Sequence, residues 1–321
     1  MPAAVHGHAV TSGGGFIYSA SGTNIPPGGG GNVDLLQRYD PVTDTWTTSF
    51  ALVPIPVVGA TLAYDTAGGP DGPRLFLFGG GNVSGTILSL VQVYTFSTNS
   101  WTTGPSLPDP RAGMGKGAFG GVVYLVGGLN SAGVAQSQNW EFNFATGTYN
   151  TVAPLPLPRA RAGAAVSGGK LYVISGRDAA GNLVDTNYEY TPPPVDMWTP
   201  RAVISTMVAG PGATVLGAMT AECDGDIIIV GGGTPFFTND TLPRGQSREP
   251  ESTNISQLYD VASDSWSAGP TLPTARFSLR AAQAGDTLIA FGGWDGLNTV
   301  TTVDRIQGPP LPVELQGFRV E

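Results

Sequence analysis

A short apolar run followed by a small-residue doublet that contains glycine occurs six times along the chain. The second glycine of each doublet is residue 22, 80, 128, 176, 232 or 293, so consecutive doublets are 48 to 61 residues apart. Each apolar run has the length of one buried β-strand. This regular recurrence indicates that the chain consists of six copies of one structural unit. The doublets are Ser21-Gly22, Gly79-Gly80, Gly127-Gly128, Ser175-Gly176, Gly231-Gly232 and Gly292-Gly293.

Two aromatic residues, seven or eight positions apart, follow the doublet in the first five units and enclose turn-forming residues. This spacing predicts a third strand, a tight turn and a fourth strand. A unit of four strands that recurs about every fifty residues predicts an all-β fold, a six-bladed β-propeller of four-stranded antiparallel blades. We expect the tryptophans to be mostly buried between blades. The pairs are Tyr39 and Trp46, Tyr94 and Trp101, Phe142 and Tyr149, Tyr190 and Trp198, and Tyr259 and Trp266.

A third motif, a Leu-Pro step followed by arginine, precedes three of the repeats and places Arg111, Arg159 and Arg276 between units. Doublet, aromatic pair and Leu-Pro step together resemble the kelch repeat over about residues 3–308. The resemblance implies a bacterial propeller of the galactose-oxidase central-domain type. We therefore expect one propeller domain, 1–308, and a tail or start of a following domain, 309–321. A side chain at Gly128 or Gly293 is expected to clash or to force a positive φ.

The net charge of −9 argues against nucleic acid as a partner, because nucleic-acid affinity comes largely from neutralised phosphates. No apolar stretch reaches the length of a membrane span. Cys223 is the single cysteine, so no disulfide can form within the chain.

The two ends of the chain have complementary gaps. The sixth unit has no aromatic fourth strand, and Met1-Pro2 occupies the place of the end of one. Either a strand upstream of Met1 completes this blade, which we favour, or residues 313–320 are recruited. Residues 311–318 also resemble the segment before an immunoglobulin-like or sorting domain in secreted bacterial proteins. This resemblance implies an extracellular or cell-surface location and a longer, multidomain chain.

The connection after each doublet and the connection between blades are expected to open on the same face, where a rigid scaffold presents its functional loops. Kelch modules that bind acidic peptides use arginines there, so the resemblance implies an anion-binding mouth. The alternative is that the polar residues cap turns and the arginines brace blades. The candidate ligand-binding residues are Asn24, Asn82, Arg111, Asn130, Arg161, Arg177, Asp178, Phe236, Phe237, Arg276, Trp294 and Asp295.

Catalytic patterns are largely missing. A copper radical oxidase on this fold needs two His, two Tyr and a Cys bonded to one Tyr, whereas this chain has only His6, His8 and Cys223. His6 and His8 are two apart, which would put both imidazoles on one face of a strand. We therefore expect no cofactor and no metal, and a non-catalytic module that binds protein or carbohydrate at the loop face.

The enzymatic alternative is a sugar epimerase or mutarotase of the sialic-acid type. This chain resembles that class of enzyme, which also uses a six-bladed kelch ring. Its general base would be a carboxylate such as Glu222, Glu249 or Glu251, with arginines holding the carboxylate of the sugar.

Overall fold

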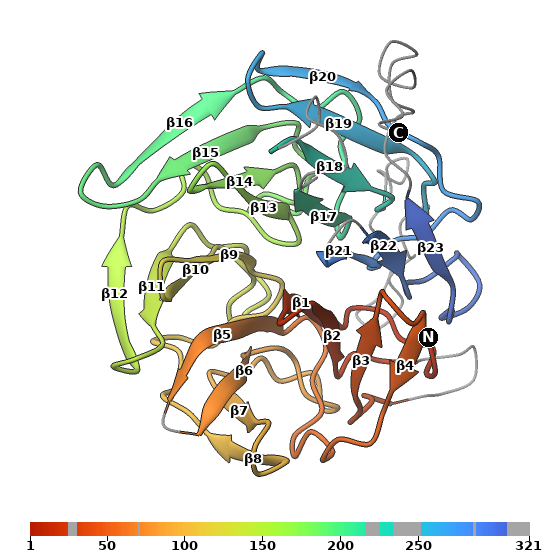
Figure 1. Ribbon diagram of the computed structural model, residues 1–321. Helices are drawn as coiled ribbons and strands as arrows, with labels where there is room; N and C mark the ends of the chain where they lie inside the picture. Colours follow the sequence, from red (N-terminus) through yellow and green to blue (C-terminus); the bar gives the residue numbers. More distant parts are fainter. Residues whose placement is uncertain (25–30, 70, 216–224, 234–251, 285–286, 307–321) are drawn as a thin grey trace, which may run out of the picture.

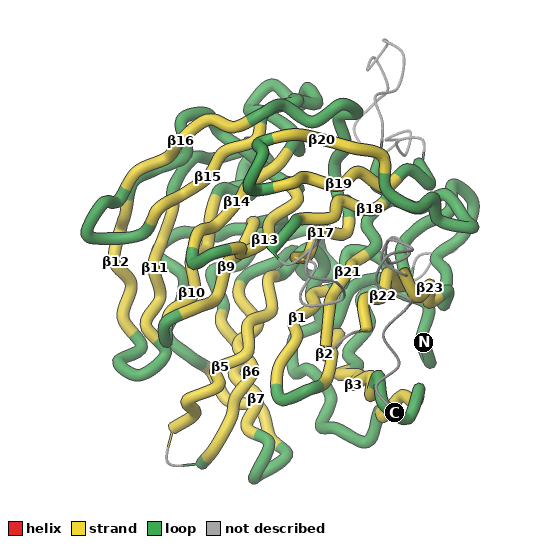
Figure 2. Tube along the Cα trace, turned by 45° about the horizontal axis from the view of Figure 1, so that its top comes forward, coloured by secondary structure: helices red, strands yellow, loops and turns green. Residues whose placement is uncertain are grey.

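The protein forms a closed ring of six β-sheets around a central axis, as the computed structural model shows (Figure 1). The structure describes residues 1–24, 31–69, 71–215, 225–233, 252–284 and 287–306. These residues form strands, turns and loops, with no helix that could span a membrane (Figure 2). The predicted all-β, six-bladed propeller with antiparallel four-stranded blades is confirmed: five blades have four strands each, and the described residues of the sixth form three.

Each blade runs in chain order from an inner strand beside the axis to an outer strand. The first three blades are β1 (Ala9–Gly13), β2 (Phe16–Ala20), β3 (Leu36–Asp40) and β4 (Thr45–Thr47); β5 (Thr61–Gly69), β6 (Gly72–Phe78), β7 (Val91–Thr95) and β8 (Ser100–Thr103); and β9 (Gly115–Phe119), β10 (Val122–Val126), β11 (Asn139–Asn143) and β12 (Thr148–Val152). The last three are β13 (Gly163–Ser167), β14 (Lys170–Ile174), β15 (Asn187–Thr191) and β16 (Met197–Arg201); β17 (Gly212–Val215), β18 (Ile227–Val230), β19 (Ser256–Asp260) and β20 (Ser265–Ala268); and β21 (Arg280–Ala284), β22 (Thr287–Phe291) and β23 (Val303–Ile306).

The aromatic pairs are direct cross-strand partners of the third and fourth strands, as the spacing predicts. Tyr94 lies opposite Trp101 with ring centroids 5.2 Å apart, and the other four pairs have the same register. The first aromatic of each pair is at most 1% exposed. The four tryptophans are less deeply buried than these partners, but each packs against a buried cluster. The expectation that they are mostly buried between blades is therefore confirmed.

Neighbouring blades are joined at these outer strands by a recurring polar contact. The indole Nε1 of Trp101 donates to the carbonyl oxygen of Ala51, which follows the outer strand of the preceding blade. The Oδ1 of Asn99, in the turn, accepts from the N–H of Ala51 at 2.8 Å and from the Tyr94 hydroxyl at 2.7 Å. Asp196 and Asp264 make the same two contacts in blades four and five.

The glycine doublets are structural, as predicted. Gly128 has φ +87°, and a Cβ there would lie 2.8 Å from Met114 Cγ. Gly293 has φ +100°, and a Cβ would lie 2.9 Å from the carbonyl oxygen of Phe277. Both positions therefore exclude a side chain, because L-residues rarely adopt such φ values and the segment that leads into the inner strand of the same blade leaves no space.

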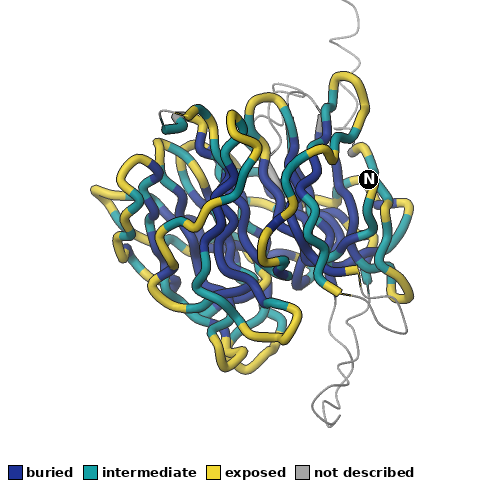
Figure 3. The backbone as a smooth tube through the Cα atoms, turned by 90° about the horizontal axis from the view of Figure 1, so that it is seen from below, coloured by how far each residue is buried: buried dark blue, intermediate teal, exposed yellow. Residues whose placement is uncertain are grey.

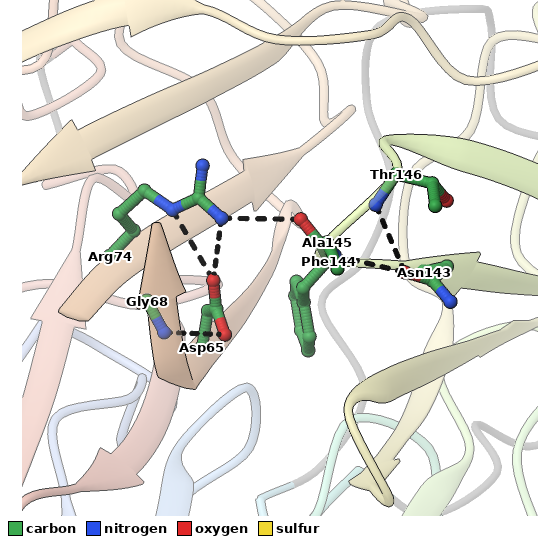
Figure 4. A network of polar contacts seen from close by, with 7 residues as sticks. All are labelled: Asp65, Gly68, Arg74, Asn143, Phe144, Ala145 and Thr146. Carbon is green, nitrogen blue, oxygen red and sulfur yellow. Dashed lines mark hydrogen bonds and ion pairs between the residues drawn. The ribbon is translucent and has the colours of Figure 1, made fainter. Parts of the chain in front are cut away.

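Buried residues concentrate between adjacent blades, whereas exposed residues lie in the loops at both ends (Figure 3). Blades two and three are also joined on the face opposite the loops that follow the doublets. There Arg74 pairs with Asp65 at 2.7 Å and donates to the carbonyl oxygen of Phe144 at 3.2 Å (Figure 4). Asn143, beside Phe144, accepts N–H groups of its own turn.

The ring closes between blade six and the N-terminal residues. Gly293 donates its N–H to the carbonyl oxygen of Val5 at 2.8 Å, and the amino group of Met1 donates to Thr301. Arg305 on β23 bonds Asp44 of blade one at 3.1 Å. The two segments predicted to complete blade six, one upstream of Met1 and one at 313–320, lie outside the described residues, so that prediction stays open.

Candidate functional site

Both kinds of connection open on one face, which we call the loop face. In every blade the residue after the doublet forms a β-bridge with a residue of the connection that leads into the inner strand of the same blade. Loops and inter-blade connections are thus joined at the entrance, as the sequence predicts. The six bridges are His6–Thr23, Val58–Gly81, Ala112–Leu129, Ala160–Arg177, Ala209–Gly233 and Phe277–Trp294.

One partner in each bridge belongs to the connection between blades. The residue directly after that partner has a left-handed backbone, with φ between +50° and +68°. Main-chain hydrogen bonds of 2.7 to 3.0 Å link these residues from blade to blade around the axis. Among the described residues, five of these N–H groups donate to the carbonyl oxygen of the neighbouring member. The donor and acceptor pairs are Gly59 and Gly7, Gly113 and Gly59, Arg161 and Gly113, Gly210 and Arg161, and Gly7 and Ser278. We call these six residues the glycine ring: Gly7, Gly59, Gly113, Arg161, Gly210 and Ser278.

Two members of the glycine ring are not glycine. Arg161 has φ +54° and Ser278 has φ +50°, a conformation that costs an L-residue roughly 1 kcal/mol or more. Non-glycine residues held in this region concentrate at functional sites. Both residues line the central cavity, so the strained positions are also the ones that bring a side chain to the entrance.

The cavity inside the ring has a volume of about 600 Å³. Its walls are the glycine ring and the first residues of the inner strands β1, β5, β9, β13, β17 and β21. Small residues such as Gly163, Ala164 and Ala213 keep it open. At the corresponding positions of other blades, Lys116 on β9 and Arg280 on β21 reach into the space.

Positive charge dominates this cavity although the whole chain is acidic. Lys116, Arg161, Arg177 and Arg280 line it, and none of the lining residues in the described part of the chain is Asp or Glu. Burial and the Arg280 charge lower the pKa of Lys116 to about 7. Burial and the Arg161 charge lower the pKa of Arg280 to about 10. The cations destabilise one another, so a bound anion would relieve the repulsion.

His6 connects the cavity to blade six. Its Nδ1 lies 3.0 Å from Thr299 Oγ1, and its ring packs edge-on against Trp294 at 5.7 Å. Burial, with a contribution from Arg161, lowers the pKa of His6 to about 4, so the imidazole is neutral at pH 7.

The expectation that His6 and His8 share one strand face is wrong. The left-handed Gly7 turns the chain between them, and His8 is fully buried against Phe291.

Three of the predicted residues, Asn82, Arg161 and Arg177, line the cavity. Arg177 donates to the carbonyl oxygen of Gly181 within its own loop. Asp178 lies beside a smaller groove of about 220 Å³ that also contacts Arg161 and Arg177.

The polar residues that begin the loops cap turns, as the alternative interpretation predicted. Asn82 Oδ1 accepts the N–H groups of Ser84 and Thr86. Asn130, Asp178 and Asp295 repeat this arrangement, and Asn24 bonds Gly31 across its loop. Their side chains shape the rim from within the loops. Phe236 and Phe237 lie outside the described residues.

Arg111 and Arg276 do not reach the mouth, so their prediction as rim residues is wrong. They are 2% and 0% exposed and point into the body of the propeller. Arg111 donates to Gln138 at 3.0 Å, and Arg276 donates to Asp304 and to the carbonyl oxygen of Gly292. Each arginine thus ties an inter-blade connection to the blade that follows it.

The sequence interpretation missed Lys116, Ser278 and Arg280 and did not place His6 at the mouth. The repeats contained a signal for these four residues. Each of the four occupies a position where most other blades have a glycine or a small or aliphatic residue. An alignment of the six units would therefore have shown each of them as an exception.

Comparisons with known proteins agree with this architecture. The kelch motif matches residues 65–108 and 110–156. Kelch-like protein 38 of Mus musculus is 35% identical over 104 residues, and that of Rattus norvegicus is 34% identical over 101 residues. Each alignment covers 32% of this chain and 16% of the relative, so the chain spans only a small part of these proteins.

The solved structure of YjhT is similar over 94% of this chain and 95% of that chain, with a TM-score of 0.76. At 18% identity this similarity concerns the fold alone. The closed ring of six blades and these matches identify the chain as a six-bladed β-propeller that carries kelch motifs at residues 65–108 and 110–156.

Proposed function

We propose that the protein is a non-catalytic interaction module that binds an acidic group of a protein or carbohydrate ligand in the cavity at the loop face. The observation that carries this proposal is the convergence of Lys116, Arg161, Arg177 and Arg280, which come from three different blades, on one cavity. Cations held by separate rigid sheets cannot move apart, so an anion is the ligand that this geometry favours.

The kelch motif supports a role in protein interaction. The loops around the cavity would supply the outer contacts, since their turns are fixed by Asn82, Asn130, Asp178 and Asp295 before any ligand arrives. Preformed loops lower the entropic cost of binding.

Calorimetric titration tests the proposal with a glutamate-rich peptide and N-acetylneuraminate, each against a neutral analogue. Arg161→Gln and Arg280→Gln should each weaken binding of the acidic ligand about tenfold or more, because each removes a charge-assisted hydrogen bond. Arg305→Gln is the matched control, since Arg305 is 49% exposed on β23, outside the cavity. No preference for the acidic ligand, or equal losses in all three variants, would reject the proposal.

A sugar epimerase or mutarotase of the sialic-acid type is the second candidate. The observation that favours it is a neutral imidazole, His6, in the same cavity as cationic side chains. A neutral histidine can accept a proton in acid–base catalysis. Glu222, Glu249 and Glu251, the carboxylates predicted from sequence, lie outside the described residues. Anomeric exchange of N-acetylneuraminate, followed by NMR with and without protein, distinguishes catalysis from binding.

We also propose an extracellular or cell-surface location within a longer chain. The support is the resemblance of residues 311–318 to segments that precede sorting domains. Cell fractionation of the source organism, with an antibody against the propeller, tests this location.

A further inference from the structure

Lys116 occupies an unusual position on the cavity wall. It lies on β9 in the register position that Val10, Leu62, Ala164, Ala213 and Ala281 occupy on the other inner strands. Its Nζ donates to the carbonyl oxygen of Val10 on β1 at 2.8 Å and to that of Leu62 on β5. The side chain therefore crosses from blade three to blades one and two while it borders the cavity.

The surroundings of Lys116 stabilise the neutral amine enough for it to be populated beside the protonated form at pH 7. Its hydrogen bonds to described residues go to uncharged main-chain oxygens, and among those residues it forms no ion pair. The charged and titratable groups that line the same cavity are Arg280, Arg161, Arg177 and His6, all cationic or neutral. Burial and the Arg280 charge bring its pKa to about 7.

The hydrogen-bond geometry leaves the amine free to react. A neutral amine has two hydrogens and one lone pair, and two carbonyl oxygens accept from this nitrogen. Both hydrogens are therefore used in hydrogen bonds, and the lone pair of Nζ occupies the tetrahedral position that neither hydrogen takes. Desolvation next to another cation is the arrangement that activates lysine toward carbonyl compounds.

Lys170, the other lysine of the chain, provides an internal contrast. Its Nζ pairs with Glu189 at 2.5 Å, and its side chain is 38% exposed on β14. Lys170 is therefore paired with a carboxylate and does not line the cavity.

We propose that Lys116 captures the aldehyde or ketone group of an acidic ligand as a reversible imine, with the ligand carboxylate held by Arg280. The Nζ lone pair attacks the carbonyl carbon, a C–N bond forms and the C=O π bond breaks. The oxygen then leaves as water with both amine protons, and a C=N bond remains. The choice of an acidic ligand rests on the proposed function, whereas the capture step rests on Lys116 itself.

Reductive trapping tests this site with the whole chain. The protein is incubated at pH 7 with glyoxylate and sodium cyanoborohydride, and peptide mass spectrometry follows carboxymethylation of each lysine. Lys116 should be modified about tenfold faster than Lys170, because the Lys116 amine, with a pKa of about 7, borders the cavity beside Arg280, whereas the Lys170 amine is paired with Glu189 outside the cavity. Acetaldehyde, which has no carboxylate, should modify Lys116 more slowly than glyoxylate does. Modification of Lys116 no faster than that of Lys170 would overturn the proposal, and this measurement requires no variant.

Two variants separate capture from anion binding. Lys116→Met should remove the rapid modification, and an unchanged circular dichroism melting curve would verify the fold. Arg280→Gln should reduce the ratio of the glyoxylate rate to the acetaldehyde rate. An unchanged ratio would overturn the assignment of Arg280 as the carboxylate partner. If acidic ligands bind in the calorimeter without rapid trapping, the imine site is wrong and the proposed function stands. If Lys116 is trapped equally fast by both aldehydes and no acidic ligand binds, the proposed function and the assigned ligand class are both wrong.

Discussion

The main-chain N–H of Gly210 donates a hydrogen bond of 2.8 Å to the carbonyl oxygen of Arg161, and both residues have left-handed φ values. The bond joins blade five to blade four at the entrance of the cavity. Because Arg161 is held in the glycine ring through its own backbone, its side chain starts from a fixed position beside the cavity rather than from a mobile loop.

The glycine ring should tolerate glycine better than alanine. Gly59→Ala should lower the free energy of unfolding by about 1 kcal/mol, because its φ of +68° is unfavourable for any residue with a Cβ. Ser278→Gly, the reverse change at an equivalent position, should leave stability within about 0.5 kcal/mol or raise it. Urea denaturation measures both, and a Gly59→Ala protein as stable as the wild type would contradict this account of the ring.

Asn99 should be replaceable by aspartate but not by alanine. Asn99→Ala removes the acceptor of Tyr94 and of the Ala51 N–H and leaves alanine at φ +47°, so we expect a loss of about 2–4 kcal/mol. Asn99→Asp should cost less than about 1 kcal/mol, because Asp196 and Asp264 fill this role in other blades. Equal losses for the two variants in thermal unfolding would show that the shared acceptor does not join the blades.

His8→Met should stabilise the protein. His8 is fully buried, and within the described residues neither ring nitrogen has a hydrogen-bond partner. The equivalent positions before inner strands β9 and β21 hold Met114 and Leu279, which are apolar and also buried. Removing an unsatisfied polar group should raise the free energy of unfolding by about 1 kcal/mol or more, measured in urea at pH 7. A loss of stability would mean that His8 has a role that the packing does not show.

Acid should destabilise the fold through His6. Its pKa is about 4 in the folded protein against an ordinary value of 6.5, so the unfolded chain takes up a proton first as the pH falls. The stability linked to neutral His6 is therefore present above pH 6.5 and lost as the pH falls toward 4, by up to about 3 kcal/mol. His6→Asn should flatten this part of the stability curve. Identical slopes for the two proteins between these pH values would contradict the prediction.

The local repeat pattern predicted strands and turns correctly. Tyr94 and Trp101 are direct cross-strand partners because a tight turn fixes the register of a hairpin, and this information is contained in one short segment. The sites at Gly128 and Gly293 were likewise predictable, since only glycine suits the sharp strand exit.

The direction of long side chains was not predictable in the same way. Arg111 and Arg161 both lie in inter-blade connections, yet Arg111 is buried and Arg161 lines the cavity. They occupy different positions of the connection, and the left-handed backbone at position 161 directs its side chain differently. Lys116 and Arg280 line one cavity from strands far apart in sequence, so the effect of Arg280 on the pKa of Lys116 depends on ring closure.

The glycine ring has a consequence for how such a protein could change its ligand. Each blade contributes one backbone position to the entrance, and four of these positions, Gly7, Gly59, Gly113 and Gly210, carry no side chain. Asparagine and aspartate adopt left-handed φ values more readily than other L-residues. At Gly59, Gly113 and Gly210, where a Cβ would meet no atom closer than 3.3 Å, single substitutions could therefore place new polar groups around the same opening, so that the entrance could diversify or be redesigned while the scaffold stays the same.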